Sequence, residues 1–329
     1  MHAKYLLIIF VVASLVPDVS WACASCGCTL SPNWEENSGQ GFKLDFRYDY
    51  INQNQLRSGA STISAAEASQ RVNQGNAQEI ESYTKNNYLT LTGEYTIDSD
   101  WKVSLVLPWI IRNHSTLGTA SNGETAGPGG GEYTSNTSNL GDVKVLGRFQ
   151  GFSEEHNFGV LFGLKLPTGV FNLSGTSTDP TAPGPAPIDR GLQPGTGTTD
   201  LILGAYFARV VSKNFDIFSE GLFQSALNSR DQYRPGDGWN FNFGTRFLGL
   251  EWVKPQVQIN ARYVQHDSGA NSDTISTGGT LVYLSPGIIV PTGSRSECYS
   301  FVQLPVYQNL LGVQLAPEYT ASLGARYSF

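Results

Sequence analysis

The sequence predicts an all-β protein, a transmembrane antiparallel β-barrel of about 12 strands with short periplasmic turns and long extracellular loops. Residues 319–329 (YTASLGARYSF) alternate between apolar and small or polar side chains up to the final phenylalanine, which is the period of a half-apolar strand. Similar runs recur along the chain. The connections between them alternate between long and short, as they do in bacterial outer-membrane barrels.

The N-terminal residues predict export. Residues 5–16 (YLLIIFVVASLV) form an apolar core after a weakly basic start, and Ser20-Trp21-Ala22 is a small-x-small cleavage motif. We therefore predict a signal peptide at 1–22, a periplasmic segment at 23–41 and the barrel at 42–329. No run approaches the ~20 apolar residues of a membrane-spanning helix, so a helical membrane protein is excluded.

Composition supports a β-rich protein without a nucleic-acid partner. The net charge is -7, which argues against nucleic-acid binding. The chain contains 36 glycines and 12% aromatic residues, a composition rich in turn and strand formers. Charged residues make up only 15%, against ~25% in an ordinary soluble domain.

Four strands are predicted most clearly, at 42–50, 158–166, 239–247 and 257–263. Each places ring-bearing or branched side chains on one face and polar or small side chains on the other. The less regular strands are expected at 87–97, 101–111, 140–151, 199–211, 215–226, 278–290, 298–308 and 319–329. Their length suits a tilted crossing of a bilayer, which takes about 9–11 residues.

The connections provide a second signal. The long loops are expected at 51–86, 112–139, 168–198, 227–238, 267–277 and 309–318. The short turns are expected at 98–100, 152–155, 212–214, 249–254 and 291–297. A secreted β-sandwich would also alternate, but it would not need its loops sorted by length to one end. Residues 61–72 are a candidate short helix, and loop 168–198 either folds inward to constrict the barrel or caps it from outside.

The closing strand predicts a specific seam. We expect residues 319–329 to pair antiparallel with 42–50, because a closed barrel leaves no open edge. Arg326 then lies near the charged row from Lys43 to Asp49. Phe329 would lie at the periplasmic rim, on the side that holds Cys23–Cys28 and Cys298.

The faces opposite the apolar ones predict a charged lumen. A charged lumen selects among solutes, so we expect a narrow pore with a mild preference for anionic or polar solutes. The alternative is that the charges pair across the lumen and fill it. The predicted pore-lining residues are Lys43, Asp45, Arg47, Asp49, Glu94, Lys144, Arg148, Lys165, Glu220, Arg246, Arg262 and Arg326.

Cys23, Cys26 and Cys28 form a CxxCxC motif. Thiolates at this spacing can bind a soft metal such as Cu(I) or Zn. In an oxidising compartment they can also form an exchanging or a purely structural disulfide, and a tether to Cys298 is a further option. Cleavage after Ala22 keeps Cys23, whereas cleavage after Ala24 removes it. Apart from this possible soft metal we predict no cofactor.

Searches for catalytic motifs give no enzyme prediction. The four histidines are widely separated, and no pair has metal-ligand spacing. No nucleophile elbow, Walker loop or dinucleotide fingerprint is present. We therefore expect a protein that is not an enzyme.

Several stretches resemble a known family. The chain is similar to bacterial transporter-type outer-membrane proteins grouped with the phenol meta-pathway degradation family. The resemblance implies a barrel that takes up aromatic compounds, and the C-terminal aromatic residue resembles the signal read by the barrel assembly machinery. The stretches are CGCTLSPNWE (26–35), GFKLDFRYDYINQNQLRSG (41–59), YTKNNYLTL (83–91), LGDVKVLGRFQGFS (140–153), FGLKLPTG (162–169), PIDRGLQPGTGTTD (187–200), ALNSRDQYRPGDG (226–238) and TASLGARYSF (320–329).

Three functions follow from these observations. The first is a channel in the outer membrane of a Gram-negative bacterium for passive uptake of small polar, anionic or aromatic solutes. The second is a membrane-anchored metal-binding or thiol redox module that works through the CxxCxC motif. The third is a structural role with a plugged lumen. The expected partners are outer-membrane lipid, the barrel assembly machinery and a small-molecule solute.

Overall fold

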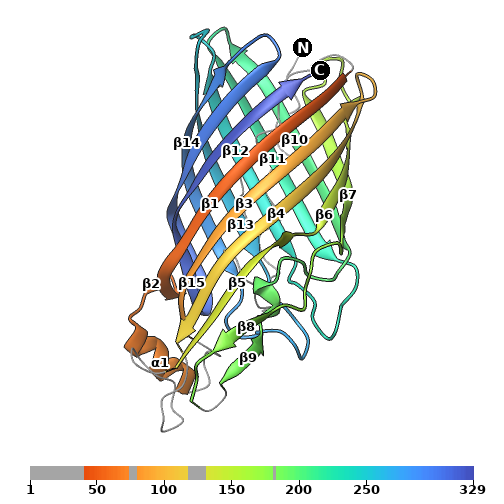
Figure 1. The fold of residues 1–329 in the computed structure, drawn as a ribbon. Helices are drawn as coiled ribbons and strands as arrows, with labels where there is room; N and C mark the ends of the chain where they lie inside the picture. The colour runs from red at the N-terminus through yellow and green to blue at the C-terminus, as the bar shows by residue number, and fades with distance from the viewer. Residues whose placement is uncertain (1–40, 74–79, 118–130, 181–182) are drawn as a thin grey trace, which may run out of the picture.

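The protein is a closed antiparallel β-barrel (Figure 1). The computed structural model describes residues 41–73, 80–117, 131–180 and 183–329. Within these ranges eleven named strands close the ring, and each pairs antiparallel with its neighbours. In ring order they are β1 (Gly41–Gly59), β3 (Ile80–Thr96), β4 (Trp101–Leu117), β6 (Val143–Phe149), β7 (Phe158–Leu166), β10 (Asp200–Ser212), β11 (Phe215–Ala226), β12 (Gly238–Phe247), β13 (Lys254–Val264), β14 (Gly279–Pro291) and β15 (Ser296–Ser328).

Strand β15 crosses the wall twice. Residues 297–310 pair with β14 and residues 310–328 pair with β1. The two halves lie side by side, since the Ser328 amide donates a 2.8 Å hydrogen bond to the Arg295 carbonyl. The chain reverses near Gly312, whose φ of +60° suits glycine. The out-and-back path of β15 brings the number of wall crossings to the predicted twelve, but the predicted loop at 309–318 is wrong because strand pairing continues through it.

The strands also extend further than predicted. β1 continues to Gly59, β3 starts at Ile80 and β4 continues to Leu117, into the predicted loops 51–86 and 112–139. The predicted strand 140–151 is shorter than expected and corresponds to β6, whereas β5 (Glu132–Leu140) lies in the predicted loop 112–139, and both pair with β4. These extensions are mostly polar, and their few apolar side chains, such as Leu56, Ile80 and Leu117, pack in the hydrophobic cluster around α1. Backbone hydrogen bonds between paired strands hold them, and such pairing leaves no hydrophobic period in the sequence.

Short and long connections lie at opposite ends of the barrel, as predicted. The short connections are 97–100, 150–157, 213–214, 248–253 and 292–295, and they lie at the end where Phe329 lies (Figure 1). The long-loop end carries β2 (Ser61–Thr62), helix α1 (Ala65–Asn73), β8 (Ser174–Ser177), β9 (Gly184–Pro187) and the 3-10 helix η1 (Arg190–Leu192).

The predicted helix at 61–72 is confirmed as α1. Its start is fixed by a reciprocal cap. The Glu67 amide donates to the Ser64 hydroxyl at 3.2 Å, and the Ser64 amide donates to the Glu67 carboxylate at 2.8 Å. Ala68 is fully buried against Ile63, Ile80 and Val313. Among the described residues, no helix is long and apolar enough to cross a membrane.

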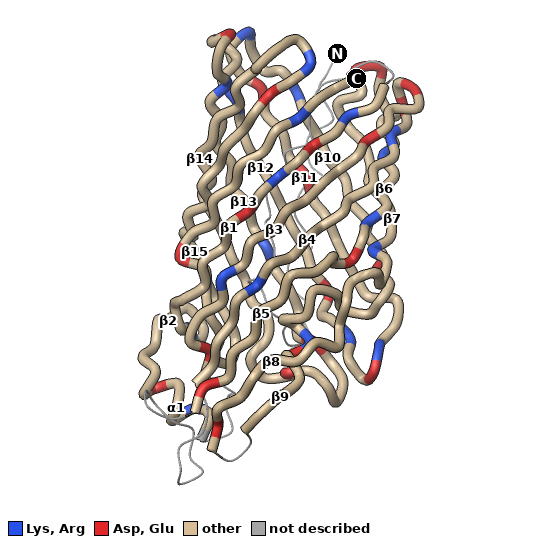
Figure 2. The backbone as a smooth tube through the Cα atoms, in the orientation of Figure 1, with Lys and Arg blue, Asp and Glu red and all other residues tan. Residues whose placement is uncertain are grey.

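The burial pattern is the reverse of that of a soluble sandwich. Phe46, Phe241 and Leu323 are about half exposed on the outside, at 49%, 51% and 58%. Asp45, Asn242 and Ser322, their neighbours in sequence, are buried. Figure 2 shows acidic and basic positions interspersed along the wall. A sandwich would bury the aromatic face, so the sandwich alternative is excluded.

The predicted seam is confirmed. β1 and β15 pair antiparallel, with Asp45 opposite Arg326 and Phe46 opposite Ala325. The Phe329 amide donates to the Phe42 carbonyl at 2.8 Å, and the two rings lie 5.7 Å apart. The last residue is therefore held by both backbone and ring contacts.

Candidate functional site: the lumen of the barrel

The interior of the barrel is the candidate site. None of the predicted pore-lining residues is exposed. Lys43, Arg47, Lys144 and Arg262 are half-buried. The remaining ones, Asp45, Asp49, Glu94, Arg148, Lys165, Glu220, Arg246 and Arg326, are buried.

Many of these charges form ion pairs, either within one strand or between neighbouring strands. Arg326 lies 3.1 Å from Asp45 and also contacts Glu297. Arg47 lies 2.9 Å from Asp49, and Arg246 lies 2.8 Å from Asp216. Pairing of this kind satisfies buried charges and narrows the bore.

A second charge network joins the wall to the loop 167–199. The Lys165 ammonium lies 2.9 Å from Asp142 and 3.1 Å from Asp200. The Thr196 amide donates to Asp142 at 2.9 Å, and the Thr198 hydroxyl donates to Asp200 at 2.7 Å. Residues 196–198 are thereby fixed against β7 and β10.

The same loop folds into the mouth of the barrel. Arg112, a buried residue of β4, donates to the carbonyl of Leu192 in η1. Gln193 holds the loop closed, because its amide donates to the carbonyls of Leu173 and Ile188 at 2.9 and 3.0 Å. Of the two alternatives for this loop, inward folding is therefore the one observed.

Arg190 links this loop to the next long loop. Its guanidinium lies 4.8 Å from the ring centres of both Phe171 and Tyr233. It also lies 3.6 Å from Asp231. Such cation–π contacts contribute most when the cation is partly desolvated, as Arg190 is.

Two carboxyl groups at the mouth are unusual. Burial raises the pKa of both Asp189 and Asp273 above the ordinary carboxyl value. Asp189 begins η1 by accepting from the Gly191 amide at 2.7 Å. Asp273 accepts from the amides of Ile275 and Ser276. Nearby, burial lowers the pKa of the His266 imidazole to about 4.

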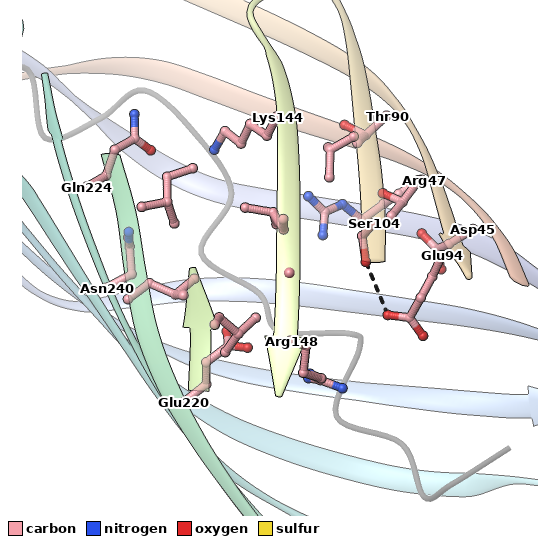
Figure 3. Close-up of a pocket in the computed structure, with 17 residues that line it drawn as sticks. Asp45, Arg47, Thr90, Glu94, Ser104, Lys144, Arg148, Glu220, Gln224 and Asn240 are labelled. Carbon is pink, nitrogen blue, oxygen red and sulfur yellow. Dashed lines mark hydrogen bonds between the residues drawn. The ribbon is translucent and has the colours of Figure 1, made fainter. Parts of the chain in front are cut away.

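Two cavities follow one another inside the barrel. The central cavity is about 210 Å³, and the mouth cavity, next to η1, is about 190 Å³. Gln224 and Asn240 line both. Figure 3 shows the polar residues of the central cavity. Its lining includes the charged residues Asp45, Arg47, Glu94, Lys144, Arg148 and Glu220 and the aliphatic residues Val106, Leu146, Leu161, Ile202 and Leu222.

The charged positions of the predicted strands do not by themselves predict the aliphatic part of the cavity lining. A signal was present in β6 (VKVLGRF). Leu146 lies in phase with Lys144 and Arg148, while Val145 is exposed on the outer face. Because Leu146 lies on the same face of β6 as Lys144 and Arg148, the alternation of the strand predicts that it faces the inside of the barrel.

The cysteine prediction is not tested. Cys23, Cys26 and Cys28 lie outside the described residues. Cys298 is exposed and free, and it pairs with Val290 near the short-connection end, as predicted. The described part of the chain contains no group of three or more His, Cys, Asp or Glu residues placed to hold a metal. The metal, redox and tether alternatives stay predictions.

Comparisons with known proteins show the fold. No family model and no curated protein matches the chain, so the phenol meta-pathway label is not confirmed. The structure is similar to an outer membrane channel from Pseudomonas putida F1, with 11% identity, a TM-score of 0.63 and coverage of 91% of this chain and 99% of that one. It is also similar to the transport unit of the autotransporter AIDA-I from Escherichia coli, with 10% identity, a TM-score of 0.52 and coverage of 93% and 95%.

Proposed function

We propose that the protein is an outer-membrane channel for the passive passage of small solutes. The observation that carries the proposal is the succession of two cavities, lined by charged, polar and aliphatic side chains, along the lumen of a barrel with an apolar outer surface. An apolar exterior suits lipid and a polar interior suits water and solute. The fold likeness to the Pseudomonas putida outer membrane channel supports this reading.

The proposed channel function also implies a cellular location for the protein and a set of partners. An outer-membrane barrel of a Gram-negative bacterium has its short turns in the periplasm, which places Phe329 and Cys298 at the periplasmic rim. Lipid covers the apolar wall, and the barrel assembly machinery inserts the chain. The solutes are small and polar, anionic or aromatic, because the inward loop and paired charges leave only small cavities.

Electrical recording of the purified protein in planar bilayers tests the proposal. In KCl we expect small discrete conductance steps, with a mild anion preference in a salt gradient. Gln193→Ala should raise the conductance because it removes the hydrogen bonds to the Leu173 and Ile188 carbonyls that hold the loop in its inward conformation. Gln70→Ala, an exposed change on α1, is the matched control and should have no effect. If neither the wild type nor Gln193→Ala gives conductance steps, the channel proposal is wrong.

A further inference from the structure

Lys144 is a cation of the central cavity whose ammonium has no hydrogen-bond or ion-pair partner in the part of the chain that the structure describes. It extends from β6 and is one of the residues that line the cavity (Figure 3). Lys165, in contrast, contacts two carboxylates. A desolvated ammonium without a counter-charge is costly. An anion entering the cavity would relieve that cost.

The carboxylates that line the cavity do not act as counter-charges to the Lys144 ammonium. The charged lining residues number three cations and three anions, but each anion contacts another side chain. Asp45 lies 3.1 Å from Arg326, and Glu94 accepts from Ser104 at 3.3 Å (Figure 3). Glu220 accepts from Asn242 at 3.3 Å.

Other charges around Lys144 also favour an anion. Lys165, Arg262 and Arg47 act on it electrostatically, and among carboxylates Asp200 opposes them. Arg262 donates to the neutral amide of Asn240 at 3.1 Å. Among the charges that act most strongly on Lys144, cations therefore outnumber carboxylates by three to one.

The wall beside Lys144 carries an aliphatic band, defined as Val106, Leu146, Leu161, Ile202 and Leu222. The band crosses five adjacent strands, β4, β6, β7, β10 and β11, so its members form one continuous surface. Within the described residues this aliphatic patch faces the cavity, and it gains free energy when another apolar surface covers it.

Two glycines make room for the band. Gly163 lies opposite both Leu146 and Ile202 in the sheet register, and Gly204 lies opposite both Leu161 and Leu222. A Cβ at Gly204 would lie 2.5 Å from Leu222 Cδ2, and one at Gly163 would lie 2.9 Å from Leu146 Cδ2. The leucines thus lie over the glycines, which leaves a shallow apolar surface beside the ammonium.

We propose that the central cavity is a binding site for small organic monocarboxylates with an apolar body. The Lys144 ammonium holds the carboxylate and the aliphatic band covers the body. The inference rests on the proposed channel and names the solute class that its cavity retains. A neutral hydrocarbon would leave the ammonium unpaired, an organic cation would be repelled, and acetate would leave the band uncovered.

Equilibrium dialysis of the purified, detergent-solubilised protein against labelled probes tests the site without any current. We expect benzoate to bind at least tenfold more tightly than acetate, benzyl alcohol or benzylamine. Lys144→Met should weaken benzoate binding at least tenfold. Leu161→Asn should weaken benzoate binding several-fold and leave acetate unchanged.

The controls separate loss of the site from loss of the fold. Lys85→Met makes the same change on the exterior and should leave benzoate binding unchanged. Lys144→Arg keeps the charge and should retain binding within about threefold. Unchanged benzoate affinity in Lys144→Met, or equal affinity for acetate and benzoate, would overturn the site. Benzoate binding without conductance would overturn the channel alone, and conductance without benzoate binding would overturn the site alone.

Discussion

At the residue scale, the seam of the barrel depends on one buried charge cluster. Asp45 on β1 accepts from Arg326 at 3.1 Å and from the Tyr299 hydroxyl at 3.0 Å. All three side chains are buried. The cluster therefore joins the first strand to both halves of β15, and its loss would leave a buried carboxylate short of donors.

Replacement of Arg326 should weaken this seam. Arg326→Met removes the cation between Asp45 and Glu297. We expect the free energy of unfolding to fall by about 2–3 kcal/mol, as for the loss of hydrogen bonds to charged groups. This decrease is measured by urea unfolding in lipid vesicles, with tryptophan fluorescence as the readout. Arg209→Met, at an exposed position, is the control, and equal stability of the two variants would contradict the role of the cluster.

At the element scale, the mouth of the barrel is formed by the loop 167–199. Its β8–β9 hairpin extends the sheet beyond β5, while η1 turns inward. A small cavity beside η1 is lined by Asp189, Asp273 and Glu81. Arg112 and Arg190 partly offset the burial of Asp189. The element that narrows the lumen is thus packed against carboxyl groups that resist ionisation.

The packing of η1 should depend on pH. Because burial raises the pKa of Asp189 and Asp273, the closed mouth holds their protons more tightly than the open one. Closure is therefore favoured below the ordinary carboxyl pKa of about 4 and loses stability as pH rises through the raised values. We expect conductance in planar bilayers to increase from pH 4 to pH 7.

A double variant tests the origin of this pH dependence. Asp189→Asn with Asp273→Asn keeps the oxygen acceptors for the backbone amides but removes the titration. Its conductance should stay low and nearly flat over the same pH range. Glu251→Gln, exposed at the short-connection end, should follow the wild-type curve. A wild-type curve in the double variant would exclude these two carboxyls as the cause.

At the scale of the whole molecule, the barrel is apolar outside and polar inside. Leu105 on β4 is 43% exposed on the outer wall, while Ser104 lines the central cavity. This inversion is stable only if a low-dielectric solvent covers the wall, since exposed apolar surface in water is costly. We therefore expect a surrounding membrane to contribute to the stability of the fold.

A charge on the outer wall should be destabilising in lipid. Leu105→Arg is expected to lower the free energy of unfolding by about 2–4 kcal/mol if the residue lies near the bilayer midplane. Leu227→Arg makes the same change in a long loop, where the leucine is 61% exposed, and should cost close to nothing. Urea titrations in lipid vesicles compare the free energies of unfolding of the two variants. Equal effects would argue against lipid contact at β4.

The sequence was most informative where the strand period and a short turn coincide. Strand β11 occupies the predicted residues 215–226, and Arg326 lies beside the charged row Lys43 to Asp49, as predicted, where it is opposite Asp45. The prediction was poorest at the long-loop end, where β15 reverses within the predicted loop 309–318. The extensions of β1, β3 and β4 there are mostly polar, and residues 309–318 carry apolar side chains without alternation, so neither shows the period of a strand.

The sequence by itself determined the barrel, the sorting of its connections and its closing seam, because these depend on a period of two and on the lengths between strands. Only the tertiary structure decided that η1 folds into the mouth, since the Arg112–Leu192 contact joins residues 80 positions apart. It also decided that Leu146 and its aliphatic neighbours face the lumen. The period places side chains on two faces, but the closure of the sheet decides which face becomes the inside.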